Sequence, residues 1–172
     1  MRTMRLTLKE TSYRTASQFL DDTPTIREEL YQVLLNPAMD LSSLSRAHFN
    51  HLLRERFKES GWENYPSHFH ERINPFAKIE LIKEDIGLEI GFRHSSLIGH
   101  NLLKFQLSAA HNSDTIKVGI FVVTTTPFQK YMKKQFNQNW AGSMNYEKVE
   151  RYLRHFKNTL LMPIYLLGID VA

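Results

Sequence analysis

The stretch that decides the fold runs from Phe76 to Arg93 and reads Phe-Ala-Lys-Ile-Glu-Leu-Ile-Lys-Glu-Asp-Ile-Gly-Leu-Glu-Ile-Gly-Phe-Arg. Its β-branched and aromatic residues recur with a period of two, which predicts strands. We expect a tight β-hairpin that turns at Glu84 and Asp85. Glu80 and Glu89 stand out, because each interrupts an apolar run.

The register of this hairpin decides how the two acids face each other. If the loop has only two residues, Glu80 lies directly opposite Glu89; if Gly87 closes a longer loop, Glu89 lies opposite Ile82. Both registers put the two acids on one face, because side chains alternate along a strand. Like charges on one face repel, and a cation between them would remove that penalty, so the hairpin predicts half of a metal site. The alternative is that each acid pairs with a basic side chain nearby, for which the candidates are Lys78, Lys83 and Arg93.

The composition suits one ordinary globular domain. The chain has 172 residues, of which 42% are hydrophobic and 23% charged. It has no cysteine, which excludes disulfides, a cysteine-based zinc site and a thiol nucleophile. No apolar run is long enough to cross a bilayer and the N-terminus lacks the apolar core of a signal peptide, so we expect a cytoplasmic protein without a membrane partner.

Basic residues gather in the last third of the chain. Between Pro127 and Leu160 there are seven lysines and arginines against two glutamates, whereas the whole chain has a net charge of only +4. Such an excess favours a polyanionic partner, although a solvated lysine-rich helix would look the same.

The order of the remaining elements predicts a mixed α/β domain. Helices are expected at 26–35, from a capping box at Thr25 and Glu28, and at 44–59, ended by Gly61. After the hairpin, helices are expected at 96–110, 128–136 and 146–159, and apolar strands at 116–125 and 164–169. The prediction is a single domain over 1–172, with a helical N-terminal part at 1–62 and a core at 76–170. Residues 6–13 are expected to form only a short extended arm.

Two polar segments are candidate contact surfaces. The polar face of helix 44–59, which carries Arg46 and Arg54, is expected to be solvated or to contact phosphates. The stretch after residue 136 is rich in amides, which can pair with base edges, although such loops are common without any function. Its candidate base-reading residues are Asn137, Gln138, Asn139, Ser143 and Asn145.

Three pieces of sequence resemble BglII-type restriction endonucleases of the PD-(D/E)XK nuclease superfamily. The first is Ile79-Glu80 together with Leu88-Glu89-Ile90-Gly91-Phe92, and the second is the apolar run 117–124. The third is 143–147 leading into 162–168. The resemblance implies a restriction-endonuclease-like core, with a mixed β-sheet of about four to five strands flanked by helices.

The resemblance also implies an active site. Glu80 takes the place of the first acid, usually Asp, and Glu89 that of the second, while Ile90 lends its carbonyl oxygen to the metal. Gly91 stands where the family has Lys, Glu or Gln. Asp85 is an alternative first acid, but it is expected at the hairpin tip. The side chains that could replace the one missing at Gly91 are Arg93, His94, Lys104 and Gln106.

The function implied is that of a type II restriction endonuclease, a homodimer that uses Mg²⁺, or Mn²⁺ as a substitute, to hydrolyse double-stranded DNA at a short specific site. Arg93 and His94 join the two acids as catalytic candidates. The expected DNA contacts, besides the amide-rich stretch, are Lys104, Lys130, Lys133 and Lys134. Gly91 motivates one alternative, a restriction fold that binds DNA without cutting it. Another is one subunit of a larger nuclease, which would bind no DNA alone.

Overall fold

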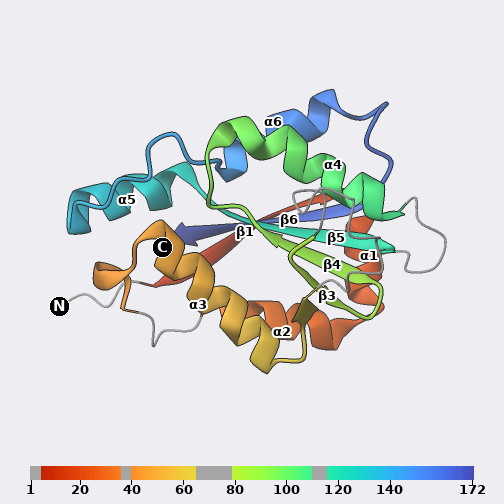
Figure 1. Ribbon diagram of the computed structural model, residues 1–172, viewed down its shortest axis with the longest axis horizontal. Helices are drawn as coiled ribbons and strands as arrows, with labels where there is room; N and C mark the ends of the chain where they lie inside the picture. The colour runs from red at the N-terminus through yellow and green to blue at the C-terminus, as the bar shows by residue number, and fades with distance from the viewer. Residues whose placement is uncertain (1–4, 36–39, 65–78, 110–115) are drawn as a thin grey trace.

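The structure is a computed structural model that describes residues 5–35, 40–64, 79–109 and 116–172. Its centre is a six-stranded sheet in the order β1-β6-β5-β4-β3-β2 (Figure 1). The strands are β1 (Leu6–Tyr13), β2 (Glu63–Asn64), β3 (Leu81–Lys83), β4 (Ile86–Ile90), β5 (Val118–Thr124) and β6 (Ile164–Val171). The α-helices are α1 (Ala16–Asp21), α2 (Pro24–Leu34), α3 (Arg46–Glu59), α4 (Ile98–Ala109), α5 (Thr126–Phe136) and α6 (Tyr146–His155). Two 3₁₀ turns, η1 (Leu41–Ser43) and η3 (Ser95–Leu97), precede α3 and α4.

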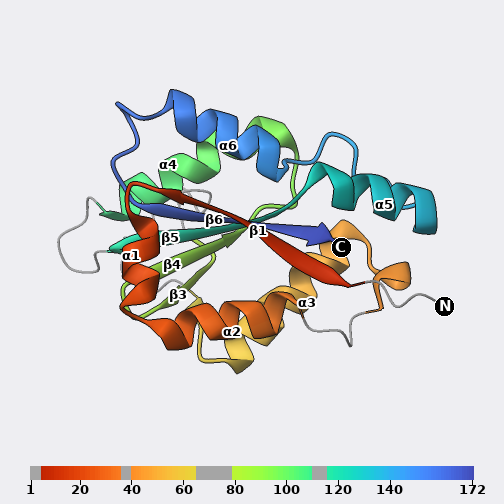
Figure 2. The ribbon, with the colours of Figure 1, turned by 180° about the vertical axis from the view of Figure 1, so that it is seen from behind.

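The sheet is mixed and covered on both faces. β4, β5 and β6 run parallel, whereas β1 pairs antiparallel with β6, β3 with β4, and β2 with β3. Helices α4 and α6 lie on one face and α2 and α3 on the other (Figures 1 and 2). Every residue of β5 is buried, as its unbroken apolar run predicts. The predicted α/β class is thereby confirmed.

Two strands of the sheet, β1 and β2, were not predicted from the sequence. β1 pairs along its whole length with β6, where the sequence predicted only an extended arm. Most of its residues are only partly buried, because it is an edge strand, so it lacks a clear apolar alternation. β2 has two residues, too few for a pattern to appear in the sequence.

The hairpin has the shorter of the two predicted loops. Lys83 pairs with Ile86 and Leu81 with Leu88, and Glu84 takes up the left-handed conformation needed for the tight turn. This register confirms that Glu80 and Glu89 meet. The first three residues of the predicted hairpin, 76–78, lie outside the described part of the chain.

Helix ends follow local chemistry, with one exception. Ser45 caps α3 by accepting a hydrogen bond from the His48 N–H, and Gly61 follows its end with a φ of 93°, as predicted. The capping box at Thr25 is wrong. α2 begins two residues earlier than predicted, at Pro24, whose fixed φ and missing N–H suit the first turn of a helix.

An aromatic cluster fixes α3 against the end of β4. Phe49 of α3 stacks on Phe92, just after β4, with ring centroids 5.2 Å apart. Trp140 packs edge-on against Phe92 at 5.4 Å and against Phe128 of α5 at 5.5 Å. All four rings are buried. The cluster therefore holds α3, α5 and the segment after β4 as one unit.

Over the described residues, no helix is long and apolar enough to cross a membrane.

Replacing Leu53 with alanine tests how firmly α3 is held. Leu53 is fully buried between α3 and the sheet. Its truncation should lower the free energy of unfolding by about 2–5 kcal/mol, because a buried cavity remains. Glu59→Ala is the matched control, since that side chain is exposed on the same helix and its loss should cost little. Urea denaturation of both variants provides the measurement; equal losses would contradict the packing described.

Candidate active site

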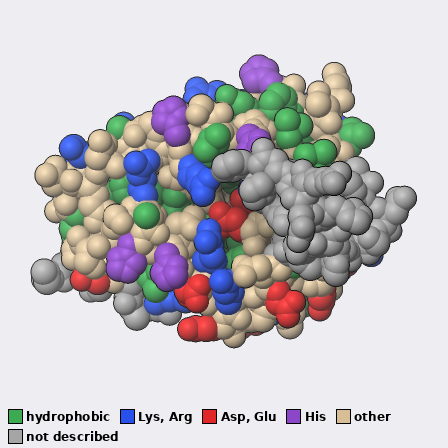
Figure 3. Space-filling view, in the orientation of Figure 1, with side chains coloured by type: hydrophobic (Ala, Val, Ile, Leu, Met, Phe, Trp, Pro, Cys, Tyr) green, Lys and Arg blue, Asp and Glu red, His purple; other side chains and the backbone are tan. Residues whose placement is uncertain are grey.

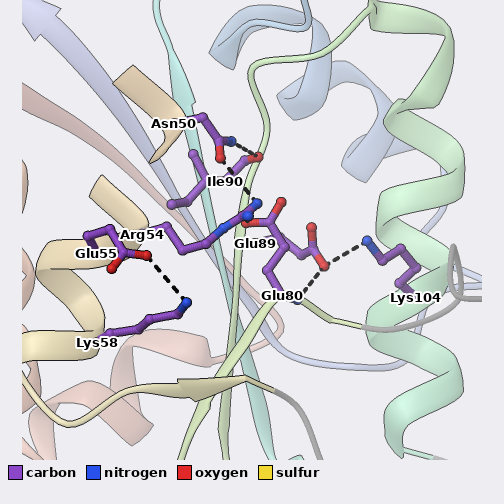
Figure 4. Close-up of polar contacts among 8 residues, drawn as sticks. All are labelled: Asn50, Arg54, Glu55, Lys58, Glu80, Glu89, Ile90 and Lys104. Atoms are coloured by element: carbon purple, nitrogen blue, oxygen red, sulfur yellow. Dashed lines mark hydrogen bonds and ion pairs between the residues drawn. The ribbon is translucent and has the colours of Figure 1, made fainter. Parts of the chain in front are cut away.

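Glu80 and Glu89 meet where the hairpin joins the main sheet. The Glu80 N–H donates to Glu89 Oε1 at 2.8 Å, which ties the two residues together across the strand pair. The Glu89 side chain is 2% exposed and that of Glu80 is 18% exposed. The two carboxylates thus lie side by side, with Glu89 buried and Glu80 partly exposed (Figure 4).

A basic side chain approaches each acid from opposite sides of the sheet. Lys104 of α4 places Nζ 2.7 Å from Glu89 Oε1. Arg54 of α3 lies 3.4 Å from Glu80 Oε2. Of the partners considered from the sequence, Lys83 pairs instead with Glu29, at 2.8 Å, and Lys78 lies outside the described residues.

The Ile90 carbonyl belongs to the same network. Its oxygen accepts a hydrogen bond from Asn50 Nδ2 at 3.3 Å, and Asn50 Oδ1 accepts one from Arg54 at 3.2 Å. Sequence reasoning did not single out Asn50 and gave Arg54 no part in the site. The signal was their spacing, because residues 46, 50 and 54 are four apart and so share one face of α3.

Three residues of this network, Asn50, Arg54 and Glu80, line a cleft of about 680 Å³. Figure 3 shows lysine and arginine side chains around an acidic patch on this face of the molecule. Most charged groups in the lining are basic, which favours an anionic ligand. The lining residues are Ser45, Arg46, Ala47, Asn50, His51, Arg54, Glu80, Phe92, Arg93, His94 and Ala141.

The candidates for the missing third side chain are placed differently. Arg93 and His94 are exposed and line the cleft, and His94 Nδ1 contacts Ser96 Oγ at 2.9 Å. Gln106 points elsewhere, since its Oε1 accepts from the N–H of Leu161 at 2.7 Å. Of these four residues, Lys104 is the one paired with an acid of the site. Asp85, the alternative first acid, pairs with Lys117 at the hairpin tip.

The amide-rich stretch is partly used within the fold. Gln138 donates to the Leu41 carbonyl at 2.9 Å, and Asn145 caps α6 by accepting from the Lys148 N–H. Ser143 is buried and accepts from Arg46 at 2.6 Å. Composition alone cannot separate amides that cap and brace loops from amides that face solvent. The exposed members of the predicted DNA contacts are Lys130, Lys133, Lys134, Asn137 and Asn139.

The acids and the carbonyl form a donor set that suits a hard cation. Mg²⁺ prefers oxygen ligands and is commonly held by one or two carboxylates. Glu80 Oε2 is buried and accepts no hydrogen bond from the described residues, although Arg54 lies 3.4 Å away, so a cation there would compete with this ion pair. No group of three or more acids, histidines or cysteines suited to a metal occurs in the described ranges, so Glu80, Glu89 and Ile90 would form a minimal site.

The environment of Glu89 favours its protonated form. Burial, followed by the charge of Glu80, raises the pKa of the Glu89 carboxyl to about 7, while Lys104 opposes the rise. A proton and a cation would therefore compete for this carboxylate near neutral pH.

A mixed sheet with two helical layers, and with paired acids beside a basic cleft, is the arrangement expected of the restriction-endonuclease fold. The chain belongs to the restriction endonuclease BglII/BglIII family, whose model matches residues 8–169. Among solved structures, restriction endonuclease BglII complexed with a DNA 16-mer matches with a TM-score of 0.73 and 21% identity, over 94% of this chain and 75% of that one. That likeness concerns the fold, and it confirms the resemblance found in the sequence. No curated protein matches.

The pKa of Glu89 can be tested through its neighbour. In the wild type, the Glu89 carboxyl carbon should titrate near pH 7 in ¹³C NMR. Glu80→Gln removes one of the two causes that raise the pKa, so the midpoint should move to lower pH while staying above the ordinary value, because burial remains. Glu55→Gln, an exposed change on α3, should leave the midpoint in place. An ordinary midpoint in the wild type would contradict the burial argument.

Proposed function

We propose that this protein is a Mg²⁺-dependent endonuclease that hydrolyses phosphodiester bonds of double-stranded DNA at a short specific site. The observation that carries the proposal is the pair of Glu80 and the buried Glu89, of which Glu80 lines a basic cleft, in a chain of a restriction endonuclease family. A carboxylate pair recruits the metal and the basic lining recruits the phosphate, so one site holds both charges.

In this proposal Glu80, Glu89 and the Ile90 carbonyl hold the metal. Bound Mg²⁺ supplies a water of lowered pKa and stabilises charge on the scissile phosphate. Asn50 keeps the Ile90 carbonyl in place through its hydrogen bond. The catalytic candidates Arg93 and His94, at the cleft, hold the phosphate as cationic or N–H donors.

The DNA contacts would extend from the cleft to α5. Arg46 and Arg54 line the cleft, and Lys130, Lys133 and Lys134 are exposed on α5. Such side chains fix the position of a duplex by contacting phosphates, whereas amides read base edges. We assign base reading first to Asn137 and Asn139, which are exposed, and only second to Gln138, Ser143 and Asn145. The solved BglII structure contains DNA, which supports this class of substrate.

The nuclease function is tested with plasmid and phage DNAs of mixed sequence, with Mg²⁺ or Mn²⁺. The wild type should give discrete fragments, and Glu89→Ala should lose cutting by at least about 100-fold, because a ligand of the metal is gone. Glu55→Ala, on the exposed side of α3, is the control and should cut normally. No cutting by the wild type with either metal, over a range of DNAs, would refute the nuclease function.

The same preparation separates the alternatives. Sequence-selective gel shifts without cutting, unchanged by loss of both acids, would favour a DNA-binding protein. Absence of DNA binding by the chain alone would favour a subunit of a larger nuclease.

We propose that the protein acts as a homodimer that docks through α4. Leu103 and Leu107, four residues apart on α4, are 47% and 49% exposed. Leu161, 59% exposed, is held beside them because its N–H donates to Gln106. Exposed apolar surface of this kind marks interfaces, and a second copy would match a two-fold symmetric DNA site.

Sedimentation of the wild type should therefore show a dimer at micromolar concentration. Leu107→Glu should give monomers, because it buries a charge in the contact. Gln135→Glu, an exposed change on α5, should leave the dimer intact. A monomeric wild type, with or without DNA, would contradict the proposed docking face.

A further inference from the structure

The third position of the nuclease motif is closed by packing. A Cβ atom at Gly91 would lie 2.5 Å from Met144 Sδ and 2.6 Å from Phe121 Cε1, and both side chains are fully buried. The backbone cannot yield easily, because the Gly91 N–H donates to the Val122 carbonyl at 2.7 Å. A polar side chain at position 91 is therefore excluded on steric grounds.

Lys104 brings an ammonium group to the same place from the neighbouring helix. Its Nζ contacts Glu89 Oε1 at 2.7 Å, and its side chain is 11% exposed (Figure 4). α4 is fixed on this face of the sheet by Ile98, Leu102 and Phe105, all fully buried. Holding so long a side chain in one conformation costs conformational entropy.

The contact leaves a defined oxygen of Glu89 for the metal. Within the described part of the chain, both donors that bind Glu89, Lys104 Nζ and the Glu80 N–H, use Oε1. Oε2 is thus the oxygen through which Glu89 can ligate a cation. An ammonium has three N–H donors, and the contact with Glu89 uses one of them.

We propose that Lys104 is a positioning residue of the nuclease site and takes over the role of the side chain that Gly91 lacks. It fixes Glu89 through Oε1 and supplies N–H donors beside the carboxylate pair, where the attacking water must be oriented. The inference rests on the proposed nuclease function. The rival explanation is that Lys104 only balances the charge of a buried acid.

The two explanations differ in the rate at saturating metal. A mere counter-ion opposes metal binding, so its loss should tighten binding and leave cutting intact. A positioning residue should instead be needed after the metal is bound. In Lys104→Met, single-turnover cleavage of the plasmid that the wild type cuts should fall by about 10- to 100-fold, as for other groups that orient metal ligands. Mn²⁺ binding, measured by calorimetry, should remain, and Lys104→Arg should recover much of the lost rate.

Lys117→Met is the matched control, because Lys117 pairs with Asp85 on the surface and is 64% exposed. Its cleavage rate should equal that of the wild type. Adding Gly91→Lys to Lys104→Met should not restore cutting, because Met144 and Phe121 occupy the space. If thermal melting shows that Lys104→Met is unfolded, Lys104→Gln replaces it with the same expected outcomes.

The remaining outcomes would contradict the proposed role of Lys104, the steric argument at Gly91 or the nuclease function on which that role rests. If Lys104→Met cuts as fast as the wild type, or if more metal alone restores its rate, Lys104 is not needed after the metal is bound and the proposal is overturned. Recovery of cutting by Gly91→Lys would contradict the steric exclusion at position 91. A wild type that binds metal but cuts no DNA refutes the nuclease function itself, and the role of Lys104 with it.

Discussion

Burial of the Glu89 carboxylate is the constraint on which the site depends. A charged group withdrawn from water needs a compensating partner, and here the backbone of Glu80 and the ammonium of Lys104 both bind one of its oxygens. These partners come from different parts of the fold: Glu80 directly precedes β3, and Lys104 lies on α4. The hairpin and α4 must therefore both be in their native positions before the Glu89 carboxylate has its two partners, which couples the site to the correct fold.

Basic groups oppose the two acids from both sides of the sheet. Arg54 approaches Glu80 from α3, and Lys104 approaches Glu89 from α4. The two acids and their partners form a balanced set, so a cation enters in competition with existing pairs. The cleft outside this set is lined mainly by basic groups and suits a phosphate. Charge thus separates the site into an inner acidic part and an outer basic part.

Packing around Gly91 explains why the lysine that contacts Glu89, Lys104, lies on helix α4 and not on the strand. Gly91 lies where Met144 and Phe121 fill the face of the sheet, so this strand position has room only for hydrogen. α4 crosses the same face and can present a longer side chain from farther away. The aromatic cluster around Phe49 and Trp140 then fixes α3 opposite, and with it the carbonyl contact of Asn50.

The sequence by itself determined most of the elements and placed the two acids on one face of the hairpin. Period-two apolar residues fixed that shared face, and unbroken apolar runs marked the buried strands, because both signals depend on local burial. The structure chose between the two registers that the sequence left open. The edge strand β1 and the contacts of Arg54, Asn50 and Lys104 were decided only by the tertiary structure. Which basic side chain reaches an acid depends on how helices cross the sheet, and residue spacing along the chain does not contain that geometry.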